Sequence, residues 1–323
     1  MVWLVGTASW TDKTLLDSGR FYPESVKTPE ARLRFYASQF NLVEVDTSYY
    51  AIPAVTTAQH WVERTPPGFV FNVKAFSLFS GQGTNTDVLP KDLRQALGPG
   101  RRLVYKDIPE EVRNELWRRF ADCLAPLKIN GKLGLVHFQF APKVARHPAV
   151  VAHIEHCLEH LPGHVLSIEF RNPSWWESAQ ATAETLAMLR RLGLVHTIVD
   201  GPQGTRNSVP PIWEATHPDH ALLRLNGRNT EAYMAPAKTA AERFDYAYSS
   251  EELRLFSERF SPIARSVKYA HAVFNNCMED KAQVNAREFR EALLGLPFRL
   301  SIFGRRQHAW CMRARSAYMR LSI

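Results

Sequence analysis

Apolar runs of strand length alternate with segments of helical period along most of the chain. Eight runs rich in Val, Ile, Leu and Phe predict buried strands at 2–6, 42–46, 69–74, 133–139, 165–171, 195–200, 221–226 and 267–275. Helical spacing of apolar residues predicts helices at 28–40, 56–64, 109–126, 148–161, 178–192, 250–264 and 281–294. This alternation predicts a single (β/α)8 TIM-type barrel of the α/β class, in which the helix between the sixth and seventh strands is weak.

Two connections are too long for ordinary barrel loops. Residues 75–108 follow the third strand and residues 201–220 follow the sixth, and both segments are rich in Gly and Pro. Long connections inside a compact domain are uncommon and are usually functional. We therefore expect residues 75–108 to form a lid or wall over the site. The barrel domain is expected to span residues 1–295, with a basic tail at 296–323.

Polar side chains gather near the C-terminal ends of the predicted strands. Because successive strand side chains point to opposite faces, Glu169 and Arg171 face one way while Ile168 and Phe170 face the other. Seven of the strands have polar residues at or near their C-terminal ends. Taken strand by strand, these are Glu44 and Asp46; Asn72 and Lys74; His137 and Gln139; Glu169 and Arg171; Asp200; Arg224 and Asn226; and His271 and Asn275. In a TIM-type barrel these ends form the mouth, where active sites lie. The pattern therefore predicts a polar ligand site.

The charges expected at this mouth are nearly balanced. Four acids oppose three bases, namely Glu44, Asp46, Glu169 and Asp200 against Lys74, Arg171 and Arg224. A balanced set favours a ligand that is fixed by directional hydrogen bonds, with one anionic group held by the arginines. It does not favour a simple polyanion.

Composition indicates a globular protein that does not enter a membrane. The chain has 323 residues, of which 45% are hydrophobic and 22% charged, and it contains no apolar run of transmembrane length and no leader pattern. The four cysteines at 123, 157, 277 and 311 do not have the spacing of a zinc site or a disulfide scaffold. We expect free thiols and a cytoplasmic location.

The positive net charge belongs to the end of the chain. Six of the 40 basic residues are arginines at or after position 299, and no acid follows them, so the rest of the chain has 34 bases against 32 acids. Such a tail can bind RNA, DNA or an anionic surface, although a solvated terminus is the commoner explanation.

Ordered motifs along nearly the whole chain resemble the domain of unknown function 72 family, the YecE-like proteins. The resemblance covers residues 3 to 294 and includes "GTASW" at 6–10, "FNLVEVDTSYYAIP" at 40–53, "IEFRNPSWW" at 168–176, "LRLNGRN" at 223–229 and "FNNCMEDKAQVNA" at 274–286. It implies a TIM-type barrel but no established reaction or cofactor. The matching positions include Glu44, Lys74, Gln139, Glu169, Arg171, Asp200, Arg224, Gly227, Arg228, Asn275, Asn276 and Asn285. This chain has Asn226 where the family usually has a histidine.

Three residues at the mouth are candidates for catalysis. Glu44 and Glu169 are suited to act as general acid and base, while the alternative is an ion-pair lattice that only holds the mouth together. Lys74 is suited to form a Schiff base if it is desolvated, but nearby carboxylates favour a paired cation. Cys277 follows the eighth strand, and the acids after it favour an unreactive thiol.

Ligand binding is assigned to further polar and aromatic residues of the mouth. These candidates are Gln139, Arg171, Asp200, Arg224, Arg228, Asn275, Asn276, Trp10 and Trp175. The tryptophans lie in loops above the barrel, where they would stack on a sugar or a base or else cap the rim. His153, His156 and His160 share one face of their predicted helix, which is expected to point to solvent, so we assign no metal site to them.

Two classes of function remain open. The first is an enzyme, of hydrolase or lyase type, that uses acid–base chemistry on a small polar or phosphorylated substrate. The second is a nucleic-acid-binding or processing protein that takes a nucleotide into the barrel mouth while the arginine tail holds the backbone. The substrate, any cofactor and the oligomeric state are not determined by the sequence, because many chemistries share this fold.

Overall fold

The computed structural model describes residues 1–205, 208–235 and 240–295. Eight parallel strands close into a barrel in the order β1-β10-β9-β8-β7-β6-β3-β2. Their bounds are Val2–Ala8 (β1), Leu42–Val45 (β2), Val70–Lys74 (β3), Leu133–Phe140 (β6), Leu166–Phe170 (β7), Val195–Asp200 (β8), His220–Leu225 (β9) and Tyr269–Phe274 (β10). Every predicted strand is present, which confirms the TIM-type barrel.

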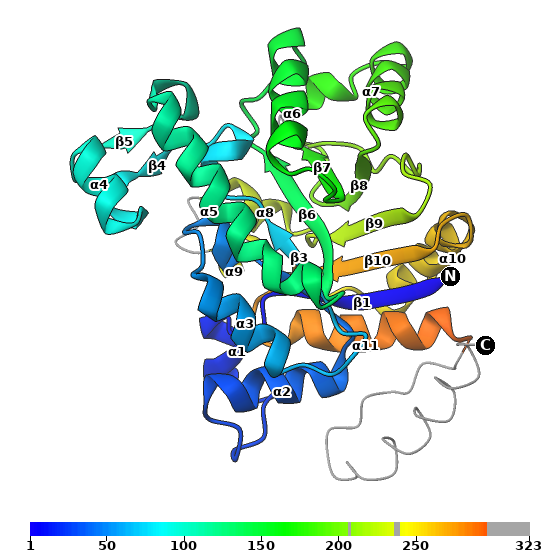
Figure 1. Ribbon diagram of the computed structural model, residues 1–323. Coiled ribbons are helices and arrows are strands. Elements are labelled where there is room, and N and C mark those ends of the chain that lie inside the picture. The colour runs from blue at the N-terminus through cyan, green and yellow to red at the C-terminus, as the bar shows by residue number, and fades with distance from the viewer. Residues whose placement is uncertain (206–207, 236–239, 296–323) are drawn as a thin grey trace.

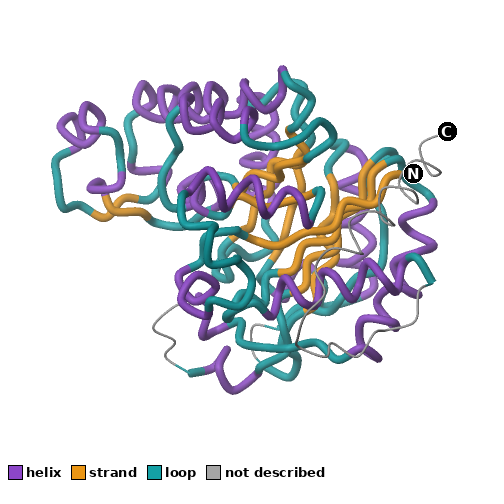
Figure 2. Tube along the Cα trace, turned by 90° about the horizontal axis from the view of Figure 1, so that it is seen from below, coloured by secondary structure: helices purple, strands orange, loops and turns teal. Residues whose placement is uncertain are grey.

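Helices surround the barrel, as Figures 1 and 2 show. The predicted ones are α2 (Pro29–Gln39), α3 (Val55–Glu63), α5 (Glu110–Ile129), α6 (Pro148–His160), α7 (Ala179–Arg191), α10 (Ser250–Arg265) and α11 (Lys281–Leu293). The described residues also form four short α-helices that were not predicted, namely α1 (Lys13–Ser18), α4 (Lys91–Leu97), α8 (Thr230–Met234) and α9 (Ala240–Arg243). No helix within the described ranges has the length and apolar character to cross a membrane.

The lower part of the barrel interior is packed with apolar side chains. The inward residues of this layer include Leu4, Leu42, Leu135, Val195, Leu222 and Val273. Gly134 leaves room for its neighbours, since a Cβ atom there would lie 2.5 Å from Asn72 Oδ1 and 3.2 Å from the His271 ring. Below its mouth the barrel is therefore a filled core, and ligand access is confined to the C-terminal end.

The segment between β8 and β9 has no helix in its described part. Instead, residues 210–219 lie as a loop against the outside of the barrel, where Ile212 and Trp213 pack against the core. The carbonyl of Ile212 lies 3.0 Å from Nε2 of His196. Thr216 Oγ1 donates a hydrogen bond of 2.7 Å to the carbonyl of Leu194. These contacts fill the place of the missing barrel helix, which agrees with the weak helical signal in the sequence.

The long connection after β3 builds a wall at the side of the barrel. It contains the antiparallel pair β4 (Thr84–Asn85) and β5 (Arg102–Leu103), which stands apart from the barrel together with α4 in Figure 1. Arg119 of α5 forms an ion pair with Asp92 of α4. The Phe79 ring stacks on Trp117 of α5 at a centroid distance of 3.5 Å. The connection is thus fastened to α5 at the side of the barrel.

This wall overturns the prediction that the histidine face of α6 points to solvent. His153 Nε2 lies 2.8 Å from the carbonyl of Phe79, and His156 Nε2 lies 2.7 Å from the Tyr105 hydroxyl. The ring of His160 packs against Trp117 at 5.1 Å. The prediction was wrong because helical period identifies the face that packs on the barrel, but it does not reveal a second layer supplied by a distant insertion.

Candidate functional site at the barrel mouth

Arg224 forms the centre of the mouth. Its side chain is fully buried, and Nη2 and Nε donate hydrogen bonds of 2.8 and 3.1 Å to Glu44 Oε1. Nη1 donates a 2.9 Å hydrogen bond to Asn226 Oδ1 and longer ones, of 3.3 and 3.4 Å, to Glu169 Oε2 and Gln139 Oε1. A buried guanidinium requires such partners, because an unpaired charge in the interior costs several kcal/mol. Strands β2, β6, β7 and β9 are therefore tied together by one side chain.

Glu169 is fully buried, as are Arg224 and Glu44. Arg171 Nε lies 3.3 Å from its Oε1, and His137 Nε2 lies 3.3 Å from its Oε2. Burial alone would raise the pKa of Glu169, but the charges of Arg224 and Arg171 and the neighbouring His137 hold it well below its usual value. Oε1 nevertheless has no hydrogen-bond partner among the described residues. Oε1 of Glu169 is therefore held by the ion pair with Arg171 alone.

Lys74 occupies the side of the mouth next to β2. Its ammonium group lies 3.3 Å from Asp46 Oδ1 and 4.7 Å from the centre of the Tyr49 ring. Burial would raise the pKa of Asp46, but the charges of Lys74 and Arg224 hold it below its usual value. This is the environment of a paired cation rather than of a nucleophilic amine.

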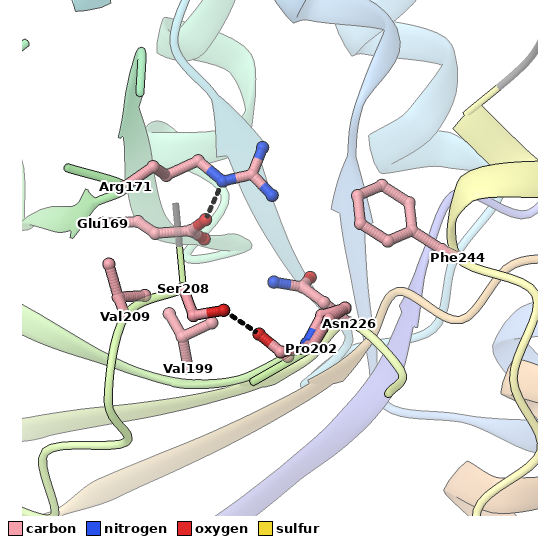
Figure 3. A pocket seen from close by; sticks show the side chains of 9 residues that line it. Glu169, Arg171, Val199, Pro202, Ser208, Val209, Asn226 and Phe244 are labelled. Atoms are coloured by element: carbon pink, nitrogen blue, oxygen red, sulfur yellow. Dashed lines mark hydrogen bonds and ion pairs between the residues drawn. The ribbon is translucent and has the colours of Figure 1, made fainter. Parts of the chain in front are cut away.

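Beside Glu169 the mouth has a small hollow that is open to solvent. Figure 3 shows Arg171 and Glu169 on one side, Phe244 on the other, and Pro202 and Asn226 below. Val199, Gly201, Ser208 and Val209 complete its lining. Asn275 donates a 3.0 Å hydrogen bond to Asn226 Oδ1, so this oxygen accepts hydrogen bonds from both Asn275 and Arg224. The Asn226 amide nitrogen has no partner within the described ranges and is available as a donor.

Three predicted ligand-binding residues lie in a separate network outside the barrel interior. Arg228 binds Asp200 through Nε and Nη2 at 2.8 to 3.0 Å, and Tyr248 donates a 2.7 Å hydrogen bond to the same carboxylate. Asn276 donates to the carbonyl of Tyr246 and to Asn285 Oδ1, each at 2.9 Å. None of the three lines the hollow. Asp200, Arg228 and Asn276 therefore fasten the ends of β8, β9 and β10 to the segments around α10 and α11.

Both candidate tryptophans also lie on the outside of the barrel. Trp175 is buried and stacks on Phe170 at 3.7 Å, while its indole nitrogen donates to the carbonyl of Val144. Trp10 packs edge-on against Trp61 and Phe71. The buried ring of Trp175 has no face left for a ligand, which agrees with the alternative that it caps the rim.

Cys277 lies beside the mouth but has a buried thiol. Burial, together with the negative charges of Asp12 and Asp46, raises its pKa well above the usual value. A thiolate is the reactive form, so this environment agrees with the expectation of an unreactive cysteine. The described part of the chain also has no group of three or more His, Cys, Asp or Glu side chains arranged to hold a metal ion.

Sequence reasoning missed two residues that bear on the site. Asp12, in the loop after β1, has its pKa raised to about 6 by burial and by the negative charge of Asp46. Its position two residues after the "GTASW" motif was a signal that could have identified it. Phe244 lines the hollow from the segment after α9, far from any predicted strand end, and nothing in the sequence pattern indicated this.

Comparisons with known proteins agree with this fold. A family model described as "Protein of unknown function DUF72" matches residues 4–299. UPF0759 protein YunF of Bacillus subtilis (strain 168) is 28% identical over 292 residues, which cover 90% of this chain and 94% of that protein. The crystal structure of a DUF72 family protein from Enterococcus faecalis V583 superposes with a TM-score of 0.75 at 25% identity, covering 92% of this chain and 97% of that one. A DUF72 family protein from Thermotoga maritima MSB8 gives a TM-score of 0.72 at 27% identity, covering 91% of this chain and 100% of that one.

Proposed function

The chain belongs to the DUF72 family, whose description gives no activity, and from the geometry of the barrel mouth we propose that the protein binds a small polar ligand with an anionic group and acts on it by acid–base chemistry. The observation that carries this proposal is the position of Arg171. Its Nε lies near Glu169, whereas its two terminal nitrogens have no hydrogen-bond partner in the described part of the chain. The side chain lines the hollow and is only 15% exposed. A guanidinium in this setting is suited to hold a carboxylate or phosphate through two parallel hydrogen bonds.

The balance of charge around Arg171 supports a ligand with few negative charges. Three buried or half-buried carboxylates face three cations in the interior cluster, which consists of Glu44, Asp46, Glu169, Lys74, Arg171 and Arg224. A polyanion would meet the carboxylates as well as the cations. A small ligand with one anionic group and several hydrogen-bonding groups fits this cluster better.

The acid–base role is assigned most naturally to Asp12. Both oxygens of Glu44 are directed at Arg224, and the lowered pKa of Glu169 makes it a weak base that remains ionised at neutral pH. Glu44 and Glu169 therefore position the arginines of the mouth. Asp12, with a pKa of about 6, is poised to accept and return a proton near neutral pH.

Nucleic-acid binding is the weaker proposal. Of its two candidate stacking surfaces, Trp175 is buried against Phe170, and Trp10 packs edge-on against Trp61 and Phe71. Its basic segment, 299–323, lies outside the described residues. A steep salt dependence of RNA or DNA binding that is lost on deleting 299–323 would favour it.

Calorimetric titration with inorganic phosphate at low ionic strength tests the role of Arg171. We expect Arg171→Gln to weaken phosphate binding by at least tenfold, because the two free guanidinium nitrogens are removed. Arg191→Gln is the matched control, since that exposed arginine pairs with Glu155 on the outer surface. Equal phosphate affinity in wild type and Arg171→Gln would refute the proposal.

A further inference from the structure

The hollow beside Glu169 has apolar surfaces on two sides and polar groups on a third. Phe244 forms one apolar side, and Val199, Pro202 and Val209 contribute the other. Figure 3 shows the Phe244 ring across the space from Glu169 and Arg171. A pyranose presents hydroxyl groups around its whole rim, and some of them would face these apolar walls unpaired. A flat ring with apolar faces and one polar edge matches the lining better.

The polar side offers an acceptor that makes only a 3.3 Å ion pair with Arg171 and a donor without a partner among the described residues. Glu169 is fully buried, yet its Oε1 has no hydrogen-bond partner among the described residues. The amide nitrogen of Asn226 is likewise without a partner there, because only Oδ1 of this residue is engaged, by Arg224 and Asn275. Buried polar groups normally have hydrogen-bond partners. A buried oxygen that accepts no hydrogen bond at the edge of a hollow therefore indicates where the N–H or O–H group of a ligand would lie.

Phe244 is held in place by its neighbours along the chain. Asn229 Nδ2 donates to the carbonyl of Asp245, and Asn276 Nδ2 donates to that of Tyr246, each at 2.9 Å. Gly227 has φ +81°, and a Cβ atom there would lie 2.6 Å from Tyr246 Cβ, so this glycine allows the segment to lie directly on the end of β9. The Phe244 ring itself packs on no other aromatic ring within the described ranges. It is therefore an aromatic side chain held at the edge of the hollow.

We infer that the ligand of the mouth contains a planar heterocycle of the nucleobase type, which stacks on Phe244 and pairs its polar edge with Glu169 and Asn226. Such a ring carries an N–H donor beside an acceptor on one edge, which satisfies Glu169 Oε1 and the Asn226 amide together. Stacking on an aromatic side chain is tolerant of base identity, so the class of ring is better determined than the particular base. The inference rests on the proposed function, in which Arg171 holds the anionic group of the same ligand.

Titration with a matched ligand series tests the inference. The probes are the four common ribonucleoside 5′-monophosphates, the corresponding nucleosides, ribose 5-phosphate and inorganic phosphate. We expect at least one nucleotide to bind about tenfold or more tightly than ribose 5-phosphate, as base stacking typically contributes. Phe244→Leu should remove most of this preference and leave phosphate affinity unchanged. Tyr269→Leu, which alters an exposed aromatic residue at the opposite end of the barrel, should behave as wild type.

The outcomes separate this inference from the proposed function. If ribose 5-phosphate and phosphate bind through Arg171 but no nucleotide binds more tightly, the heterocycle is refuted while the anion site stands. A preference for nucleotides that persists in Phe244→Leu also refutes it. If nucleosides bind as tightly as nucleotides, and Phe244→Leu weakens both, the heterocycle stands and the anion site fails. Failure of all probes to bind refutes both.

Discussion

Arg224 shows why the charges of the mouth cannot be assigned to catalysis from their types alone. It contacts Glu44 and Glu169 while fully buried. A buried ion pair adds little net stability compared with apolar residues, but removal of one partner leaves the other charged and unpaired. The cluster therefore holds side chains in fixed positions, and the groups left over, chiefly Arg171 and Asn226, are the ones available to a ligand.

Replacement of Arg224 tests this structural role. We expect Arg224→Met to lower the free energy of unfolding by about 3–5 kcal/mol, because two buried carboxylates lose their cation. Urea denaturation at pH 7 measures the change. Arg191→Met, at a 60% exposed side chain, should cost less than about 1 kcal/mol as a surface pair. A similar small loss for Arg224→Met would show that the cluster does not organise the mouth.

Asp12 gives a pH-dependent prediction that requires no ligand. Its pKa is about 6 in the native protein and near 3.8 in the unfolded chain, so the native state holds the proton to higher pH. Native stability therefore falls as pH rises through this range, and the full penalty is present above pH 6. Asp12→Asn should stabilise the protein by about 2 kcal/mol at pH 7.5. The difference should vanish below about pH 3.5, and a variant without added stability at pH 7.5 would contradict the assignment.

Residue patterns predicted the interior cluster well and its surroundings poorly. Alternation along β7 correctly placed Glu169 and Arg171 together, because a strand fixes which side chains share a face. Asp200 ends β8 on the face shared with His196 and Ile198, which points away from the interior, so strand alternation does not support its predicted place in the mouth. Arg228 lies beyond the end of β9, where strand alternation no longer fixes direction.

At the level of elements, the loop that replaces a barrel helix depends on His196. Nε2 bonds the Ile212 carbonyl, while Nδ1 is buried without a partner among the described residues. Burial lowers the pKa of His196 to about 4, so the unfolded chain binds a proton more readily between pH 6.5 and 4. His196 therefore lowers the free energy of unfolding as the pH falls through this range. The loss is roughly 3 kcal/mol once the pH is below both pKa values.

Denaturation at pH 7 and pH 4.5 measures the contribution of His196. His196→Gln keeps a donor for Ile212 but does not titrate, so its stability should fall less than that of wild type between the two pH values. The comparison must be made between variants, because Asp12 acts in the opposite direction over part of this range. Equal losses in wild type and His196→Gln would contradict the prediction.

Gly227 provides a second prediction for an element, the segment that carries Phe244. Gly227 and Gly204 both have positive φ, of +81° and +78°, but only at Gly227 would a Cβ atom collide with a neighbour. We expect Gly204→Ala to cost about 1–2 kcal/mol from backbone strain alone. Gly227→Ala should cost about 1–3 kcal/mol more, because Tyr246 must move. Equal costs in thermal or urea denaturation would mean that the segment does not rest on β9.

For the whole molecule, the architecture was predictable because it follows from local patterns repeated eight times. Each strand and main helix has the apolar spacing that its place in the barrel requires. The insertion after β3 was predicted only as a lid or wall. Its packing on α5 and α6 depends on contacts such as Phe79 with Trp117, between residues far apart in the chain. Phe244 could not be predicted for the same reason.

The most direct test of the account is native mass spectrometry of the whole protein after incubation with the small-molecule fraction of a cell extract. We predict that wild type retains a small molecule with an anionic group, which is released on denaturation, and that Arg171→Gln does not retain it. Arg191→Gln should retain it as wild type does. Equal retention by wild type and Arg171→Gln, or no retention by wild type, would contradict the claim that Arg171 binds the ligand at the barrel mouth.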